Sequence, residues 1–269
     1  MVALLPALTV KTWRDHWRAL LGWSAGLAAL SAMELSVYPS VRSTAAGAGQ
    51  FVNSLPEALK TMFRMSDYTS GPGFIGAELF SFTIPLVFIA VGTSFGSGAT
   101  ALEEERGTAD LLLTLPITRS RVLLEKLVAL LSDMLVLGLL LWLVLLVGVH
   151  AAGMSDVGGG GLAVASLSSV LLGWVYAGVG LLVGAWSGKR SIAVGTAVTL
   201  AIAAFVLYSL GPLVHGLRPW LRVTPFQWAF GNDPLRNGLS VGYLALLLAT
   251  SVVFFGLSVL AFNRRDITA

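Results

Sequence analysis

The sequence contains no cysteine and few charged residues, and each scarcity excludes a class of protein. Without cysteine, the chain has no disulfide, no thiol nucleophile and no cysteine-based metal site. Only 12% of its 269 residues are charged, against about 25% in an average soluble domain. Hydrophobic residues make up 56% of the chain, in several runs of about 20 residues, the length that crosses a bilayer. We therefore predict an all-α polytopic membrane protein, since a helix satisfies its own backbone groups within lipid.

Residue patterns for catalysis and nucleotide binding are missing as well. The three histidines, His16, His150 and His215, fall near the ends of separate segments, and no two have the spacing of metal ligands. Gly188-Lys189-Arg190 lacks the Ser or Thr that ends a phosphate-binding loop, and Val183 stands where its first glycine belongs. We therefore expect no cofactor in this chain and no enzyme activity of its own. Any ATP-driven work would need another subunit.

One enzyme class, the CAAX-type membrane proteases, has an EExxxR signature that the acidic residues from position 103 resemble superficially. Thr108 and Ala109 occupy the positions where that signature requires arginine. Because no nucleophile–base pair and no metal-ligand set is present either, an intramembrane hydrolase is the least favoured function.

Six apolar segments predict six membrane spans in a single transmembrane domain over residues 1–269. Pro39 is expected to end the first span, and Pro85 to kink or break the second. Residues 39–73 and 214–238 would lie on the outer side, the former with an amphipathic helix over residues 51–63. No cleavable signal peptide is evident at the N-terminus. The spans are placed at about 19–38, 74–102, 122–149, 162–186, 191–213 and 239–262.

Residues 1–18 predict an amphipathic helix that lies in the membrane interface before the first span. Its tryptophans, Trp13 and Trp17, are interfacial residues, and Lys11, Arg14 and Arg18 recur on another face of the helix. Two interpretations remain open for this helix. It is either a basic anchor that fixes orientation or a surface that contacts a partner.

The distribution of basic residues predicts that both termini are cytoplasmic. With six spans, eleven of the 17 Lys and Arg residues fall on the side of the termini and six on the other. The short loops agree, because Lys189 and Arg190 lie in one and residues 150–161 contain no Lys or Arg.

The densest charge in the chain lies between the second and third predicted spans. The segment from Glu103 to Lys126 holds nine of the 31 charged residues, a density that cannot lie within hydrocarbon. Three acids open a helical stretch, Leu111 and Leu112 belong to its apolar face, and Pro116 ends it. Thr118 is expected to cap the next helix. A short helix held between two spans is a segment that a cytoplasmic partner could bind and displace.

Several residues within the predicted spans carry more than one interpretation. Asp133 is a functional candidate as an intramembrane acid, but the favoured explanation is that it pairs with Lys126 on the same helix face or snorkels to the membrane boundary. Glu34 and Glu78 either face a cavity or are solvated at the interface. Glycine pairs four apart predict close helix packing within the bundle or, alternatively, a subunit interface. These pairs are Gly22/Gly26, Gly92/Gly96, Gly180/Gly184/Gly188 and Gly238/Gly242.

Three stretches resemble the permeases of ABC-2 type transporters. The charged segment reads LEEERGTADLLLTLPITR over residues 102–119 and is similar to the segment between spans 2 and 3 in that family. The stretches at 224–238, with TPFQW and DPLRNG, and at 262–267, FNRRDI, are similar to the segments around the last span. The six-span layout extends the resemblance over the whole chain.

The resemblance implies an assembly and a role for the charged segment. Two permease subunits, identical or related, would form a pathway between them, with two ABC ATPase subunits docked on the cytoplasmic side. Residues 103–118 would be the coupling segment, seated on the ATPase, and Lys11, Arg14 and Arg18 a second contact with the ATPase or the membrane surface. The coupling residues are expected to be Glu103, Glu104, Glu105, Arg106, Gly107, Thr108, Leu111 and Leu112.

Two functions follow from this resemblance. The first is the permease subunit of an exporter for a hydrophobic or amphiphilic substrate such as a drug, an antibiotic or a lipid, in a bacterial cytoplasmic membrane. The second is a membrane component in which ATP hydrolysis drives mechanical work on an extracytoplasmic partner. Whether the outer segments form a closed lid or an open docking surface would separate the two.

Overall fold

The computed structural model describes residues 5–62, 65–101 and 118–264, and every regular element within them is a helix. Most are α-helical, but η1 and η3 are 3₁₀ segments and η2 is a π-helix. The order is α1 (Leu5–Ser43), α2 (Ala45–Ser54), α3 (Glu57–Met62), η1 (Met65–Asp67), α4 (Gly71–Ile75), η2 (Gly76–Thr83), α5 (Ile84–Gly98), α8 (Arg119–Ala151), α9 (Gly159–Ser187), α10 (Arg190–Leu210), η3 (His215–Val223), α11 (Pro225–Phe230), α12 (Pro234–Asn237) and α13 (Val241–Arg264).

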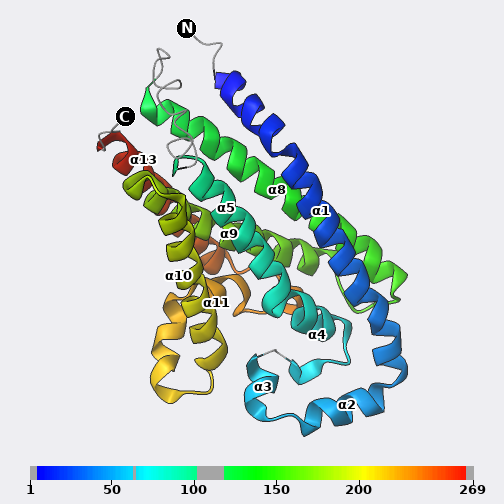
Figure 1. The fold of residues 1–269 in the computed structure, drawn as a ribbon. Helices are drawn as coiled ribbons and strands as arrows, with labels where there is room; N and C mark the ends of the chain where they lie inside the picture. Colours follow the sequence, from blue (N-terminus) through cyan, green and yellow to red (C-terminus); the bar gives the residue numbers. More distant parts are fainter. Residues whose placement is uncertain (1–4, 63–64, 102–117, 265–269) are drawn as a thin grey trace.

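Six helical stretches are long and apolar enough to cross a membrane, which confirms the predicted all-α polytopic fold. α1 begins and α13 ends at the same end of the bundle (Figure 1), which we call the terminal end. The opposite end, where α2, α3 and η3 lie, is called the distal end. The stretches are Leu8–Ser43, Gly71–Gly98, Arg119–Ala151, Gly159–Ser187, Arg190–Leu210 and Val241–Arg264.

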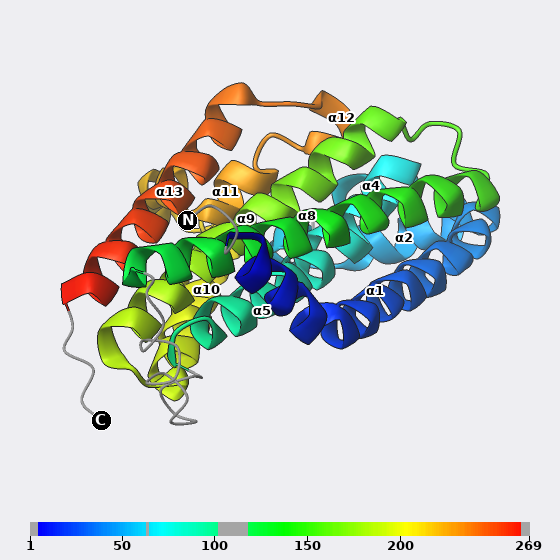
Figure 2. The same cartoon turned by 90° about the horizontal axis from the view of Figure 1, so that it is seen from above.

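Helix α9 is the centre of the bundle. It packs against α5, α8, α10 and α13, and 78% of its most apolar window is buried, against 17% in α1 and in α10. Helices α1 and α13 lie at opposite edges, and α1 packs mainly along α8 (Figure 2). Helix α5 therefore packs against the most deeply buried of the described spans.

The contact between α5 and α9 is close because both helices present glycine. A Cβ atom on Gly92 would collide with the carbonyl oxygen of Gly173, and one on Gly96 with that of Ala177. This confirms packing within the bundle for the Gly92/Gly96 pair, since small residues let helix backbones approach. The pair Gly22/Gly26 differs, because a Cβ at either position would meet no atom within 4 Å.

Helix α1 is continuous from Leu5 to Ser43, whereas the sequence predicted an interfacial helix over 1–18 and a span that ends at Pro39. The proline lies inside the last turns of the helix. Tyr38 is buried there, with its ring centroid 5.3 Å from that of Phe74. The Ser43 hydroxyl donates to the carbonyl of Ser40 at 2.9 Å. Tertiary packing and side-chain bonds thus outweigh the local preference against helix before proline.

Pro85 is accommodated by a π-helical segment rather than by a break. Proline has no N–H, so the regular ladder cannot continue through it. In η2 the N–H of Ile84 instead donates to the carbonyl of Leu79, five residues earlier. The result is a continuous path from α4 through η2 to α5 that carries an irregular turn at Glu78.

The first distal segment is two short helices and not the single amphipathic helix predicted over 51–63. Leu55 is extended, with ψ of 144°, because it precedes Pro56 and the proline ring excludes the helical region there. Helices α2 and α3 therefore meet at an angle, and both lie at the distal end (Figure 1).

Side-chain bonds hold the distal segments to one another. Arg236 of α12 donates to Asp67 of η1 and, at 3.0 Å, to the hydroxyl of Ser70. The N–H of Gly71 donates to Asp156 Oδ2 at 2.8 Å. The hydrogen bond from Ser70, followed by the charge and hydrogen bond of Arg236, lowers the pKa of Asp67. The two long distal segments therefore form one connected layer.

Candidate coupling region at the terminal end

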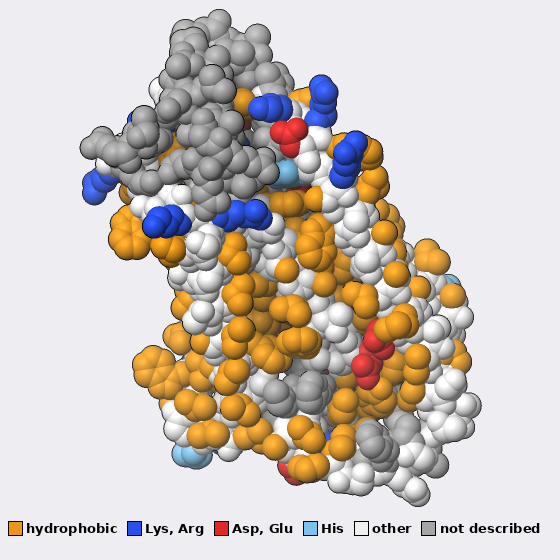
Figure 3. All heavy atoms as spheres, viewed as in Figure 1, with side chains coloured by type: hydrophobic (Ala, Val, Ile, Leu, Met, Phe, Trp, Pro, Cys, Tyr) orange, Lys and Arg blue, Asp and Glu red, His pale blue; other side chains and the backbone are white. Residues whose placement is uncertain are grey.

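The terminal end brings together the helix ends on either side of the predicted coupling segment. α5 ends and α8 begins there, and the predicted coupling residues Glu103 to Leu112 lie between them, outside the described residues. Basic side chains gather at this end on the face shown in Figure 3, above a largely hydrophobic surface. Lys11, Arg14 and Arg18 are exposed there, and the guanidinium of Arg18 lies 5.5 Å from the ring of Trp17.

Helix α8 begins where the sequence predicted. Thr118 is extended, with ψ of 146°, and occupies the N-cap position, but its side chain makes no capping hydrogen bond. Its carbonyl instead accepts the N–H of Arg121 at 3.0 Å. The chain is thus a regular helix from Arg119 onward.

One face of the first turns of α1 is bound to α8 by side chains. Thr9, Trp13 and His16 recur at helical spacing and all face α8. Their partners extend over two turns of that helix, so the N-terminal part of α1 is packed onto α8 and does not lie apart from it. The bonds are Thr9 Oγ1 to Glu125 O (3.4 Å), Trp13 Nε1 to Ser132 Oγ (2.9 Å) and His16 Nδ1 to Asp133 Oδ2 (2.8 Å).

The pair of His16 and Asp133 is the innermost of these bonds. Asp133 is buried, with 4% of its side chain exposed, and His16 is 26% exposed. The imidazole also stacks on Phe95 of α5, with ring centroids 4.3 Å apart and planes within 12°. His16 therefore connects α1, α8 and α5, three helices that meet beside the coupling segment.

The predicted pairing of Asp133 with Lys126 is wrong. The amine of Lys126 donates to the carbonyl of Ala99, at the end of α5, with a separation of 2.7 Å. Asp133 points to α1 instead. Pairing between residues on one helix was inferred from spacing alone, whereas the contact observed depends on how α1 lies against α8.

Further polar bonds fix the other helix ends at the terminal end. Glu125 is buried, and its Oε1 lies 3.4 Å from Nε of Arg121. Asn263 of α13 donates from Nδ2 to the hydroxyl of Ser120 at 2.7 Å. Arg190, which opens α10 after the left-handed Gly188, donates to Ser94 of α5 at 3.3 Å. The starts of α8 and α10 are therefore bonded directly to the helices beside them.

The described residues contain no group of three or more His, Asp or Glu side chains placed to hold a metal ion. The polar side chains at the terminal end bond chiefly to one another and to backbone carbonyls. This arrangement joins helices to one another.

A comparison with known protein families identifies the chain. The model of a family described as ABC-2 family transporter protein matches residues 1–267. The chain belongs to the ABC-2 family. As an ABC-2 permease it is the membrane component of an ABC transporter, has no ATPase site of its own and associates with ABC ATPase subunits. No curated protein sequence matches the chain.

Sequence reasoning missed His16 as a functional candidate. The signal that could have found it is the polar and aromatic series Thr9, Trp13 and His16, which recurs at i, i+4 and i+7 on α1. These residues lie on a different face from Lys11, Arg14 and Arg18. Only the structure shows that this face meets a buried carboxylate.

Proposed function

We propose that this ABC-2 permease is a subunit of an exporter that moves a hydrophobic or amphiphilic substrate. Two permease copies, identical or related, would form the pathway, and two ATPase subunits would bind ATP and Mg²⁺. The terminal end would face the cytoplasm of a bacterial cell, with the exporter in its cytoplasmic membrane. The concentration of basic residues at that end supports this orientation.

The observation that carries the proposal is which two helices residues 103–118 connect along the chain. They join α5, whose backbone packs on the central helix α9, to α8, which is bonded to α1 through His16 and Asp133. An ATPase that moves this segment would displace both helices. The close glycine contact would pass the motion to α9, and the His16 contacts would pass it to α1.

In this scheme the charges of Glu104 and Arg106 contribute to docking on the ATPase. Glu103, Glu105, Gly107, Thr108, Leu111 and Leu112 complete the docking segment. Lys11, Arg14 and Arg18, exposed near the start of α1, supply a second contact with the ATPase or with lipid phosphates.

Mechanical work on an extracytoplasmic partner is the second candidate. The bonded distal layer favours it, because Arg236 and Asp67 hold the two long distal segments together and Asp156 bonds the first of them to the loop between α8 and α9. Together they form a surface that a partner could contact. In the exporter, the same layer would cover the outer end of the pathway.

The test is to co-express the chain with the ATPase encoded beside it and to purify the complex in mild detergent. ATP hydrolysis is then measured with and without hydrophobic compounds. Stable co-purification with hydrolysis stimulated by some compounds is the expected result. Co-purification with hydrolysis that no compound alters would favour the mechanical function, and failure to bind the ATPase would contradict both.

A further inference from the structure

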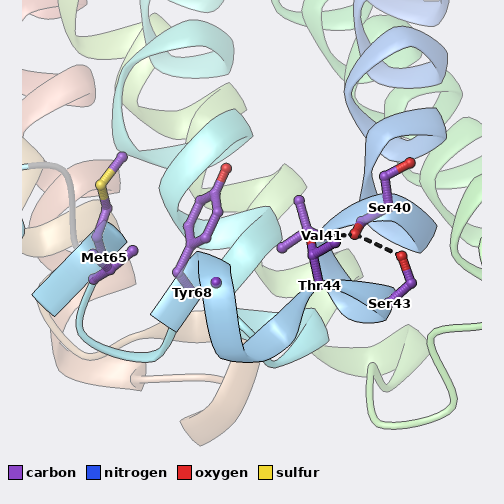
Figure 4. Close-up of a pocket in the computed structure, with 8 residues that line it drawn as sticks. Ser40, Val41, Ser43, Thr44, Met65 and Tyr68 are labelled. Carbon is purple, nitrogen blue, oxygen red and sulfur yellow. Dashed lines mark hydrogen bonds between the residues drawn. The ribbon is translucent and has the colours of Figure 1, made fainter. Parts of the chain in front are cut away.

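The two long distal segments expose different kinds of surface. The first folds around a cavity of about 670 Å³, where the hydroxyls of Ser43 and Thr44 donate to the carbonyl of Ser40 (Figure 4). The second contains η3, in which no residue is buried and only Leu217 and Leu221 are half-buried. Within the described part of the chain, η3 therefore lies largely open on the surface.

One row of side chains along η3 is apolar. In a 3₁₀ helix the side chains at i and i+3 lie one above the other. Leu217, Trp220 and Val223 follow one another at this spacing, and we call them the η3 row. Trp220 is 61% exposed and Val223 is 58% exposed. An open row of this kind needs an apolar environment outside the described chain.

The half-buried side chains show how η3 is oriented on the bundle. Leu221 belongs to a second row and packs at the end of α10, where a Cβ on Gly211 would collide with it. Because Leu217 and Leu221 both face inward, the third row is the one that points away from the bundle. That row is formed by Gly216, Pro219 and Arg222.

The position of η3 along the chain places it at the distal boundary of the membrane. Helix α10 has 21 residues and extends about 31 Å, close to the thickness of about 30 Å of a hydrocarbon core. The chain returns to the bundle at α11, where the buried ring of Phe226 lies 5.5 Å from that of Phe205 and 6.0 Å from that of Tyr208. The short connection between these helices therefore stays near the end of the span.

The charge of this region has one sign. η3 contains Arg218, Arg222 and His215, and the chain has no acidic residue between Asp156 and Asp233. A guanidinium binds phosphate through paired N–H donors. Tryptophan and basic residues beside an apolar row are typical of segments that lie in the membrane interface.

We propose that η3 lies in the lipid interface at the distal end, with Trp220 and Val223 against acyl chains and Arg218 and Arg222 bound to lipid phosphates. A phospholipid supplies an apolar chain and an anionic group at this depth, which together match the row and the two arginines. The inference goes beyond the proposed function, because a contact with lipid needs neither a substrate nor an ATPase.

The absence of cysteine allows a direct test, since one introduced cysteine takes one spin label. Trp220→Cys and Val223→Cys place the label on the η3 row. Gly216→Cys places it on the outward row, where no atom lies within 4 Å of the Cβ position. Ile202→Cys is the lipid reference, because Ile202 is exposed in the middle of the α10 span.

The full chain is placed in nanodiscs of phosphatidylcholine and phosphatidylglycerol. Electron paramagnetic resonance then measures how often each label collides with oxygen, which partitions into lipid, and with a neutral, water-soluble nickel chelate. The ratio of oxygen to nickel collisions should be several-fold higher on the η3 row than at Gly216→Cys and should approach that of Ile202→Cys.

Two results would overturn the assignment. Nickel collisions as frequent on the η3 row as at Gly216→Cys would place the row in water. Protection of the row from both reagents would mean that protein covers it, such as a second copy of the chain. Either result leaves the proposed function untouched, and failure of the chain to bind an ATPase would leave the lipid contact untouched.

A second set of variants tests the individual side chains with the label kept at Val223→Cys. Trp220→Ser should raise the nickel collisions of this label several-fold, because the largest apolar side chain of the row is lost. Trp186→Ser is the control, since it removes a tryptophan that is 73% exposed at the terminal end and should change nothing. Thermal unfolding identifies the variants that fold.

The arginines are tested in the same labelled chain. Arg218→Gln combined with Arg222→Gln should also raise the nickel collisions of the label, because the contacts with lipid phosphates are lost. An unchanged label in this double variant would overturn the phosphate contact, and an unchanged label in Trp220→Ser would overturn the anchoring role of the tryptophan.

Discussion

The Nδ1 atom of His16 lies 2.8 Å from Oδ2 of Asp133, although the two residues are 117 positions apart in the chain. The imidazole also stacks on Phe95, so a single side chain near the start of α1 is held by α8 and α5 together. These are the helices that flank the segment expected to contact the ATPase. This contact joins the N-terminal part of α1 to both helices, which its amphipathic pattern alone did not reveal.

Loss of His16 should destabilise the protein more than a neutral replacement of Asp133. His16→Ala leaves the buried Asp133 side chain without its partner, and an unsatisfied buried polar group costs about 1–3 kcal/mol. Asp133→Asn removes the carboxylate itself, so it should destabilise the protein less than His16→Ala does. Thermal and denaturant unfolding in detergent would measure both.

A double-mutant cycle isolates the interaction itself. We expect the effects of His16→Ala and Asp133→Ala to be non-additive by about 1–3 kcal/mol, as for residues in contact. Additive effects would contradict an energetic coupling between the two side chains. Trp13→Phe, which removes the bond to Ser132 and part of the aromatic ring, serves as a milder comparison at the same interface.

The glycine contact between α5 and α9 predicts a strong difference between two glycines. Gly96→Val should destabilise the bundle by about 1–3 kcal/mol, because the added methyl groups collide with the backbone at Ala177. Gly22→Val should have little effect, since no atom lies within 4 Å of its Cβ position. Comparable destabilisation by both would show that the α5–α9 contact is not specially close.

The ion pair between Arg236 and Asp67 should break in acid. The pKa of Asp67 is lowered by the Ser70 hydrogen bond and by Arg236. The stability that this ion pair contributes is therefore fully present above 3.8, the ordinary pKa of an aspartate. It is lost as pH falls from there through the lowered value. Hydrogen exchange at residues 65–73 should therefore accelerate below about pH 4.

Asp67→Asn supplies the control for this pH effect. The variant should exchange rapidly at neutral pH and show no additional step in acid. Global stability should change by at most about 1 kcal/mol, because the Arg236 and Asp67 side chains are 41% and 45% exposed. An acid step that persists in Asp67→Asn would assign it to another group.

The sequence was sufficient for the number and order of the spans, because length and hydropathy decide them. It was insufficient where tertiary contacts outweigh local preference. Pro39 should have ended a helix, but the buried ring of Tyr38 keeps the last turns of α1 in place. At Pro85 the proline rule indicated an irregularity correctly, and the form it takes, a π-helical turn, is visible only in the structure.

The candidate site was predictable in part. The charged segment from Glu103 to Lys126 was found by its composition, and its central residues lie outside the described part of the chain. The partner of Asp133 was not predictable, because the spacing that favoured Lys126 contains no information about the register of α1 on α8. Glu34 and Glu78 were recognised as acids near span ends, but the bond that Tyr68 donates to Glu78 was not predictable.

The central claim is that the charged segment couples this permease to an ATPase, and charge reversal tests it most directly. The variant Glu104→Arg with Arg106→Glu keeps the net charge and reverses both signs. The control, Glu57→Arg with Arg222→Glu, makes the same exchange at exposed positions of the distal end. Co-purification of the ATPase is measured for wild type and both variants. The account predicts that the control retains the ATPase and the Glu104/Arg106 variant loses most of it, whereas full retention by that variant would contradict the coupling role.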